Sequence, residues 1–183
     1  MTLLEELDRY HPADEREAAM TAEIITFLGA HDDAFERTQR LGHITASAWI
    51  VDPDRTHALL THHRKLGRWL QLGGHVDGER ETRAAALREA REESGLQEIV
   101  PLTGGIYDVD VHVIPARRDE PEHKHYDIRF AFEADRLAPL IVSDESHALA
   151  WVNLRELDRY ETDESVVRLA RKTSQLGVRL PYS

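Results

Sequence analysis

The chain has 183 residues, 41% of them hydrophobic and 31% charged, and its 23 Lys and Arg against 34 Asp and Glu give a net charge of −11. This length and composition are typical of a globular domain and exclude the disordered class. The acidic excess argues against a nucleic-acid surface, which needs a basic stripe, and on charge alone also against a polyphosphate substrate. The absence of Cys excludes disulfides, thiolate metal sites and Cys nucleophiles.

No stretch of the sequence is long and apolar enough for a transmembrane helix, and residues 1–10 lack the basic and then apolar layout of a signal peptide. A chain without Cys also suits a reducing compartment. We therefore expect a cytoplasmic protein with no membrane partner.

The predicted elements begin with a helix over residues 14–29, which has an acidic first turn and an apolar side. A short helical turn is predicted at 32–37. From residue 43 the composition shifts to Ile, Val, Thr and Trp, which predicts strands at 43–51 and 57–62 joined by an Asp-Pro-Asp turn.

The second half follows a Gly-rich segment around Gly73 and contains both element types. A strong helix is predicted first, then two alternating strands that form a hairpin, a short strand and two closing helices. Their ranges are 82–94, 106–114, 123–132, 149–152, 154–160 and 162–174. The whole pattern predicts an α/β fold with helices on both sides of a mixed sheet.

The helix at 82–94 carries the residues most informative about chemistry. Glu89, Glu92 and Glu93 stand at i, i+3 and i+4 and therefore share one face, away from the small apolar residues of the helix. Carboxylates at these spacings repel, and a hard divalent cation such as Mg²⁺ or Mn²⁺ would reverse the sign of that interaction. Acids on a helix are more often simply a solvated face.

The spacing of the whole segment separates these two interpretations. It resembles the Nudix box, the signature G-x5-E-x7-R-E-U-x-E-E-x-G-U of the Nudix hydrolases, where U is a bulky aliphatic residue. The matching residues are Gly74, Arg88, Glu89, Glu92, Glu93, Gly95 and Leu96, seven of the nine defined positions. Arg80 stands where the family has its first Glu, and Ala90 where an aliphatic residue is usual.

The resemblance covers about residues 43–158 and implies an α/β/α sandwich, and we expect this domain to span 41–183. Residues 1–40 lie outside the resemblance, and the apolar side of their helix predicts an extension packed on the domain. It implies metal-dependent hydrolysis of a pyrophosphate bond in a nucleoside diphosphate linked to another moiety, such as a nucleotide sugar or a dinucleotide. The metal ligands would be Gly74, Glu89, Glu92, Glu93 and Glu145, which stands six residues before Trp151 as in many members. Arg88 would orient the cluster, and Glu89 and Glu145 are rival bases. Dimers are common in this family.

Three other functions remain open. Arg80 favours a Nudix-like domain that senses a ligand without hydrolysis, whereas the retained Glu89, Glu92 and Glu93 oppose it. Another chemistry on the same fold, such as isomerisation of a diphosphate, is open except in its Cys-dependent form. The third is an acidic helix that binds a partner without metal.

A second signal lies in the predicted hairpin. His123, His125, Asp127 and Arg129 fall on one strand face, and Asp108, Asp110 and His112 on the corresponding face of the other strand. The two polar faces would adjoin as a His/Asp patch, which is a half-exposed sheet face or a functional surface. The half-exposed sheet face is the favoured interpretation. Two His and a carboxylate can bind a transition metal, but a functional patch would more readily line a substrate cleft than form a separate metal centre. The predicted substrate contacts are therefore His75, Arg68, His125, Asp127 and Arg129.

Overall fold

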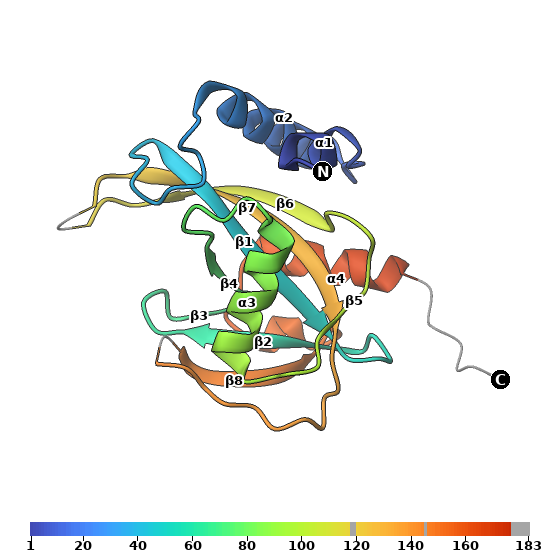
Figure 1. Cartoon of the computed structure of the whole chain (residues 1–183). Helices are drawn as coiled ribbons and strands as arrows, with labels where there is room; N and C mark the ends of the chain where they lie inside the picture. Colours follow the sequence, from blue (N-terminus) through green and yellow to red (C-terminus); the bar gives the residue numbers. More distant parts are fainter. Residues whose placement is uncertain (118–119, 145, 177–183) are drawn as a thin grey trace. The chain divides into compact units, whose positions relative to one another are not determined.

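The computed structural model describes residues 1–117, 120–144 and 146–176 (Figure 1). The elements are α1 (Leu3–Asp8), α2 (Glu15–Ala30), β1 (Gly42–Val51), β2 (His57–His63), β3 (Arg68–Leu70), β4 (Leu72–His75), α3 (Thr82–Ser94), β5 (Val100–Pro101), β6 (Asp108–Ile114), β7 (His123–Glu133), β8 (Ser146–Asn153), the 3-10 turn η1 (Leu157–Arg159) and α4 (Glu164–Gln175). None of the helices in the described ranges is both long and apolar enough to cross a membrane.

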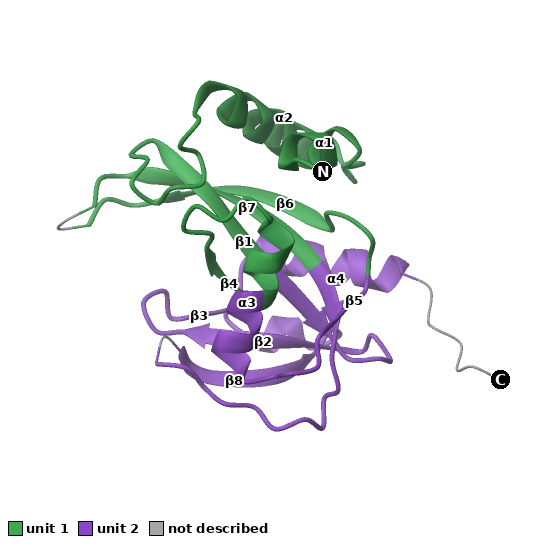
Figure 2. Cartoon of the chain, in the orientation of Figure 1, with its two compact units in different colours: residues 1–47, 73–87, 103–130 green, residues 48–72, 88–102, 131–183 purple. Residues whose placement is uncertain are grey.

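The strands form one 8-stranded sheet. Hydrogen bonds join β3, β2, β1, β7 and β5 in that order, while β4 pairs with β1, β6 with β7 and β8 with β2. The fold is therefore mixed α/β with helices before and after the strands, which confirms the predicted class. Two compact units divide the described chain, and β1, α3 and β7 each contribute residues to both (Figure 2).

Unit 1 comprises residues 1–47, 73–87 and 103–130. Here α2 packs on the β6–β7 hairpin: the Phe27 ring stacks on Tyr126 with centroids 4.2 Å apart, and Lys124 Nζ lies 2.7 Å from Glu23 Oε1. The buried Glu17 accepts hydrogen bonds from Tyr10 and from the Ala13 amide. These bonds fix the turn between α1 and α2, so both N-terminal helices belong to this unit.

Unit 2 comprises residues 48–72, 88–102 and 131–183 as far as they are described. Its sheet pairs β2 with β8 over most of their length, from His57 opposite Asn153 to Thr61 opposite Leu149. The helix α4 begins at the N-cap Asp163, whose carboxylate accepts from the Val166 amide. Trp49 is fully buried and donates from Nε1 to Thr173 Oγ1 at 2.8 Å, so it is a core residue.

Several predicted elements differ from the observed ones. The predicted helix at 154–160 is only the 3-10 turn Leu157–Arg159, and the segment 32–37 forms hydrogen-bonded turns rather than a helix. The short strands β3, β4 and β5 and the six-residue helix α1 were not predicted, because each has too few residues to establish a period. The predicted hairpin of β6 and β7 is confirmed, and its observed register places Asp110 opposite Asp127 and His112 opposite His125.

Candidate active site

The helix α3 spans Thr82–Ser94, as the sequence predicts. Its Ala, Leu, Arg and Glu residues favour helix, and Ala85, Ala86 and Ala90 form its buried side. It stops at Gly95, which has φ of +74°, a conformation that suits glycine, and whose amide donates to the Arg91 carbonyl at 2.8 Å. The helix therefore ends directly after the three carboxylates.

These three carboxylates, which lie in unit 2, have different environments. The side chain of Glu92 is 61% exposed and that of Glu89 is 17% exposed, whereas Glu93 is buried. A buried carboxylate costs free energy unless a hydrogen bond or a cation compensates for the water it loses. The three acids thus extend from solvent into the packed side of α3, rather than forming a uniformly solvated face.

Arg88 joins two of these acids. Its Nη1 lies 2.5 Å from Glu89 Oε1 and 3.4 Å from Glu92 Oε2. One guanidinium therefore orients both carboxylates and partly offsets their repulsion. The donor set contains only carboxylate oxygens, which fits hard divalent cations such as Mg²⁺ and Mn²⁺.

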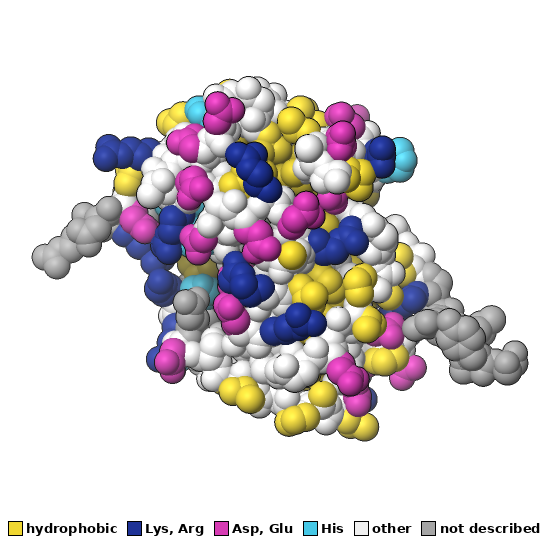
Figure 3. All heavy atoms as spheres, viewed as in Figure 1, with side chains coloured by type: hydrophobic (Ala, Val, Ile, Leu, Met, Phe, Trp, Pro, Cys, Tyr) yellow, Lys and Arg dark blue, Asp and Glu magenta, His cyan; other side chains and the backbone are white. Residues whose placement is uncertain are grey.

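Charge elsewhere on the surface is mixed. On the face shown in Figure 3, acidic and basic side chains are interspersed. The α3 acids differ from this background because they follow helical spacing and one of them is buried.

The loop that precedes α3 contains the Gly-rich part of the motif and belongs to unit 1. Gly73 and Gly74 lie in β4, and Gly73 approaches β1 so closely that an added Cβ would stand 2.6 Å from the Ala46 carbonyl oxygen and from Ser47 Cα. Gly78 has φ of +85° and donates from its amide to the Phe35 carbonyl at 2.9 Å. The close approach at Gly73 leaves no room for a Cβ, and the positive φ at Gly78 favours glycine.

Arg80, which replaces the first Glu of the motif, contacts the segment before β1. Its guanidinium carbon lies 5.0 Å from the centroid of the Phe35 ring, and its Nη2 donates to the Asp32 carbonyl at 3.3 Å. The side chain thus holds the turn segment by a cation–π contact and a hydrogen bond. In this chain the position has a structural role.

A buried ion network lies on the polar face of the β6–β7 hairpin. Arg129 is 2% exposed and lies 2.7 Å from Asp127, 3.4 Å from Asp108 and 3.4 Å from Asp110. Burial opposes its charge, but the three carboxylates outweigh burial and raise the pKa of Arg129 above its ordinary value. The guanidinium charge is therefore already matched by carboxylates of the protein.

The same network extends to β1. Asp127 accepts hydrogen bonds from Thr45 Oγ1 at 3.0 Å and from Ser47 Oγ at 2.9 Å. These hydroxyls alternate with buried apolar residues along β1, so this strand also presents a polar face. The network consequently links three strands.

Five imidazole rings cluster beyond this network in unit 1. Ring centroids lie 4.8 Å apart for His43 and His125, 5.0 Å for His43 and His123, 5.0 Å for His43 and His75, and 5.4 Å for His112 and His125. Burial, followed by the charges of neighbouring His residues, lowers the pKa of His43 to about 4 and that of His125 to about 2. Burial and then Arg37 also lower the pKa of His75.

The predicted substrate contacts therefore separate in the structure. His75 and His125 lie in the imidazole cluster, Asp127 and Arg129 lie in the buried ion network, and Arg68 is exposed at the start of β3. Glu145, the predicted additional ligand or base, lies outside the described residues. His43 was not among the predicted site residues, although the alternation His-x-Thr-x-Ser along β1 indicates its polar face.

Comparison with known proteins shows the family. The model of the NUDIX domain matches residues 41–171, and the chain therefore belongs to this family. It is accordingly a hydrolase of pyrophosphate bonds. The match excludes residues 1–40, where α1 and α2 lie.

Solved structures agree with this fold. The Nudix hydrolase RenU of M. smegmatis superimposes with a TM-score of 0.58 at 18% identity, covering 76% of this chain and 91% of that one. A C. elegans Ap4A hydrolase in a binary complex has a TM-score of 0.57 at 18% identity, and the match covers 72% of this chain and 95% of that one. A NUDIX-family hydrolase of Clostridium perfringens has a TM-score of 0.55 at 24% identity, and the match covers 74% of this chain and 98% of that one. No curated protein matches the sequence.

Proposed function

We propose that the protein uses Mg²⁺ or Mn²⁺ to hydrolyse the pyrophosphate bond of a nucleoside diphosphate linked to another moiety, such as a nucleotide sugar or a dinucleotide. The observation that carries this proposal is the carboxylate set of α3, with Arg88 between Glu89 and Glu92 and with Glu93 buried on the next turn. Glu92 and Glu93 would be the principal metal ligands. A bound divalent ion would neutralise the pyrophosphate and lower the pKa of a coordinated water.

The residues of α3 have distinct parts in this proposal. Arg88 holds Glu89 through its 2.5 Å contact, which keeps that carboxylate in one orientation for metal binding or for proton abstraction from water. Glu92 is the most exposed acid of the three and is the one that an incoming ion can reach with least rearrangement. Glu89 is the base that the described residues offer, and Glu145 stays the rival base by family resemblance.

The acidic net charge agrees with this function. The excess acids repel a free polyphosphate, but carboxylates that hold divalent cations offer positive charge to it instead. The proposal therefore requires that activity be absent without metal.

An assay of purified protein tests the proposal. Formation of mononucleotide products from ADP-ribose, nucleotide sugars, dinucleoside polyphosphates and nucleoside triphosphates is measured by chromatography with Mg²⁺, with Mn²⁺ and with excess EDTA. We expect metal-dependent turnover of at least one class. Glu92→Gln and Glu93→Gln should each lower kcat/KM by at least about 100-fold while circular dichroism stays unchanged.

The matched control is Glu98→Gln, since Glu98 is an exposed carboxylate beyond the end of α3. This variant should retain wild-type activity. Turnover in excess EDTA, or full activity of Glu92→Gln and Glu93→Gln, contradicts the proposal. Tight binding of one of these compounds without turnover would instead support the ligand-sensing alternative.

A further inference from the structure

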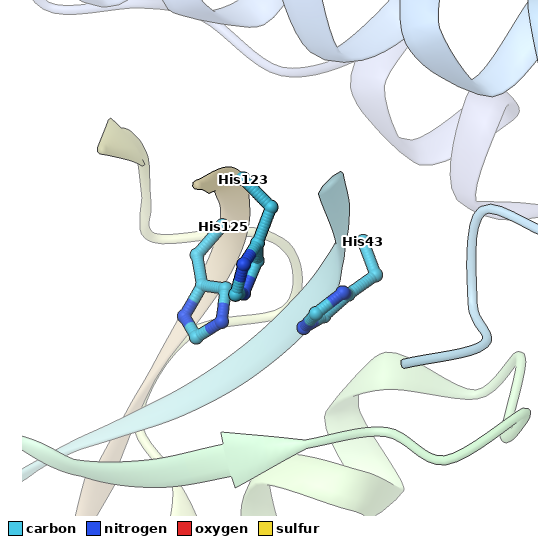
Figure 4. Close-up of side chains that lie close together, drawn as sticks. All are labelled: His43, His123 and His125. Carbon is cyan, nitrogen blue, oxygen red and sulfur yellow. The ribbon is translucent and has the colours of Figure 1, made fainter. Parts of the chain in front are cut away.

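The imidazole cluster of unit 1 contains three rings that face one another (Figure 4). His43 comes from β1 and His123 and His125 from β7, and one ring nitrogen of each lies within 4.8 Å of the corresponding nitrogens of the other two. About 80 residues of sequence separate His43 from the other two, so the pairing of distant strands creates this arrangement. The acids of α3, by contrast, lie in unit 2.

The ring nitrogens of this cluster are poorly satisfied. Both nitrogens of His43 and the Nε2 of His125 are buried and have no hydrogen-bond partner among the described residues. A buried polar atom without a partner destabilises the fold, because it has lost its hydrogen bonds to water and gained none in return. The fold therefore retains an energetic cost at these positions, and a ligand for the nitrogen lone pairs would reduce it.

His123 has the arrangement typical of a metal ligand. Its Nδ1 lies 2.9 Å from the Pro121 carbonyl oxygen, which can only accept, so Nδ1 carries the proton. The lone pair is then on Nε2. A carbonyl that fixes the tautomer in this way is a common support for metal-bound histidine.

The cluster is suited to a metal cation rather than to a phosphate. Both nitrogens of His43 and Nε2 of His125 are buried beside other imidazoles, and among the described residues no carboxylate is hydrogen-bonded to these atoms. Neutral imidazoles offer lone pairs and no positive charge, so they attract a cation and do not neutralise an anion.

We propose that His43, His123 and His125 bind one transition-metal ion of the zinc class, at a site separate from the carboxylates of α3. Imidazole suits Zn²⁺, Co²⁺, Ni²⁺ and Cu²⁺, whereas carboxylates suit Mg²⁺ and Mn²⁺, so the two donor sets select different ions. Tetrahedral zinc with bonds of about 2.0–2.1 Å places its nitrogen ligands roughly 3.3 Å apart. The present nitrogen–nitrogen distances, which are at most 4.8 Å, must therefore shorten by up to about 1.5 Å, which ring rotation can supply.

Two further histidines surround this site. The ring of His75 lies 5.0 Å from that of His43 and 5.3 Å from that of His125, and it is placed to supply a fourth ligand. His112 Nδ1 lies 3.0 Å from Asp110 Oδ2, next to His125. A metal here would connect β1, β4 and β7 and would fix the strand that carries Gly74.

Metal binding to the full-length protein tests this inference. The protein is stripped with EDTA, desalted and titrated with Zn²⁺ against a chromophoric chelator, and it is loaded separately with Co²⁺ for visible spectroscopy. We expect about one Zn²⁺ per chain, a rise in Tm on Zn²⁺ addition and the intense visible bands of tetrahedral Co²⁺. The variant His43→Gln/His125→Gln should bind Zn²⁺ at least about 100-fold more weakly.

Two control variants locate the site. His62→Gln/His147→Gln removes another close pair of rings, with centroids 5.3 Å apart, and should bind Zn²⁺ like the wild type. Glu92→Gln/Glu93→Gln should also bind Zn²⁺ normally, so that a failure of the proposed hydrolysis does not affect this test. If it binds Zn²⁺ normally but lacks turnover, the two sites are separate.

The inference is overturned if the wild type binds no Zn²⁺ or if the His43→Gln/His125→Gln variant binds it equally well. Should that variant fail to fold, His123→Gln replaces it, because His123 is less buried and lies at the start of β7. The Co²⁺ spectrum of the wild type is independent of any variant. Its lack of tetrahedral bands would equally overturn the inference.

Discussion

Arg129 donates from Nε to Asp127 at 2.7 Å, and both side chains, two residues apart on β7, are buried. The same guanidinium lies 3.4 Å from Asp108 and from Asp110. A buried ion pair contributes little net stability compared with apolar packing, but the removal of one partner leaves the opposite charge in a low-dielectric interior. The network is therefore most sensitive to loss of its cation.

Replacement of Arg129 tests this sensitivity. Arg129→Met should lower the free energy of unfolding by about 3–5 kcal/mol, because three buried carboxylates lose their shared cation. Urea unfolding followed by circular dichroism measures the change. Arg129→Lys keeps the charge without the planar guanidinium, so it should lower the free energy of unfolding less than Arg129→Met does. A loss below about 1 kcal/mol in Arg129→Met would show that the carboxylates do not depend on this cation.

The lowered pKa values of His43 and His125 predict how stability changes with pH in metal-free protein. An unfolded imidazole has a pKa of about 6.5, so between that pH and about 4 the unfolded state binds more protons than the fold does. Stability should therefore fall as pH decreases from about 6.5 towards 4. Urea unfolding at pH 7 and pH 5, in the presence of EDTA, measures this fall.

Variants show how much of this pH-dependent loss of stability is due to the imidazole cluster. His43→Gln/His125→Gln should lose less stability than the wild type between pH 7 and pH 5, because it lacks the two imidazoles that resist protonation. His11→Gln changes an exposed histidine and should follow the wild type. Equal losses in all three proteins would refute the assignment of this pH dependence to the cluster.

Arg88 is expected to matter for catalysis more than for stability. Its contacts with Glu89 and Glu92 are partly exposed, and such ion pairs contribute about 0–1 kcal/mol. Arg88→Ala should therefore leave Tm nearly unchanged but lower kcat by about 10-fold or more, since Glu89 loses its orientation. Steady-state kinetics and thermal unfolding measure the two effects. Arg91→Ala, an exposed arginine on the same helix, is the control.

Gly73 is predicted to tolerate no side chain. A Cβ there would lie 2.6 Å from two backbone atoms of β1, and φ is +151°, so Gly73→Ala must displace β4 or strain the backbone. We expect a loss of about 1–3 kcal/mol in the free energy of unfolding. Gly104→Ala is the matched control, because nothing lies within 4 Å of its added Cβ. If Gly73→Ala left the free energy of unfolding unchanged, the close approach of β4 to β1 would be contradicted.

The sequence alone predicts the elements with strong local signals. The helix at Thr82–Ser94 has helix-forming residues and a following Gly95, and the β6–β7 hairpin alternates over both strands, so these were found. The helix α1 was missed because it has only six residues, although Thr2 and Glu5 form a capping box that marks its start. The predicted helix at 154–160 failed because its helix-forming residues do not outweigh tertiary packing, which leaves a single 3-10 turn.

Some residues of the candidate sites could likewise be predicted from the sequence, and others could not. The acids of α3 occur within one helix, so their spacing could be read from the chain directly. His43 reaches His123 and His125 only through pairing of distant strands, which sequence periodicity does not predict. The burial of Arg129 among three carboxylates likewise depends on the register between β6 and β7, so its charge could not be judged from the sequence.

The polar face of the β6–β7 hairpin also determines which alignment of these strands is stable. Because side chains alternate between faces, a shift by one residue would bring Ile128 opposite Asp108 or Asp110 and turn Arg129 to the apolar side. An apolar interior tolerates such shifts more readily, since one aliphatic side chain resembles another. The buried charges therefore help to fix the register, because they make a one-residue shift of β6 against β7 costly during folding.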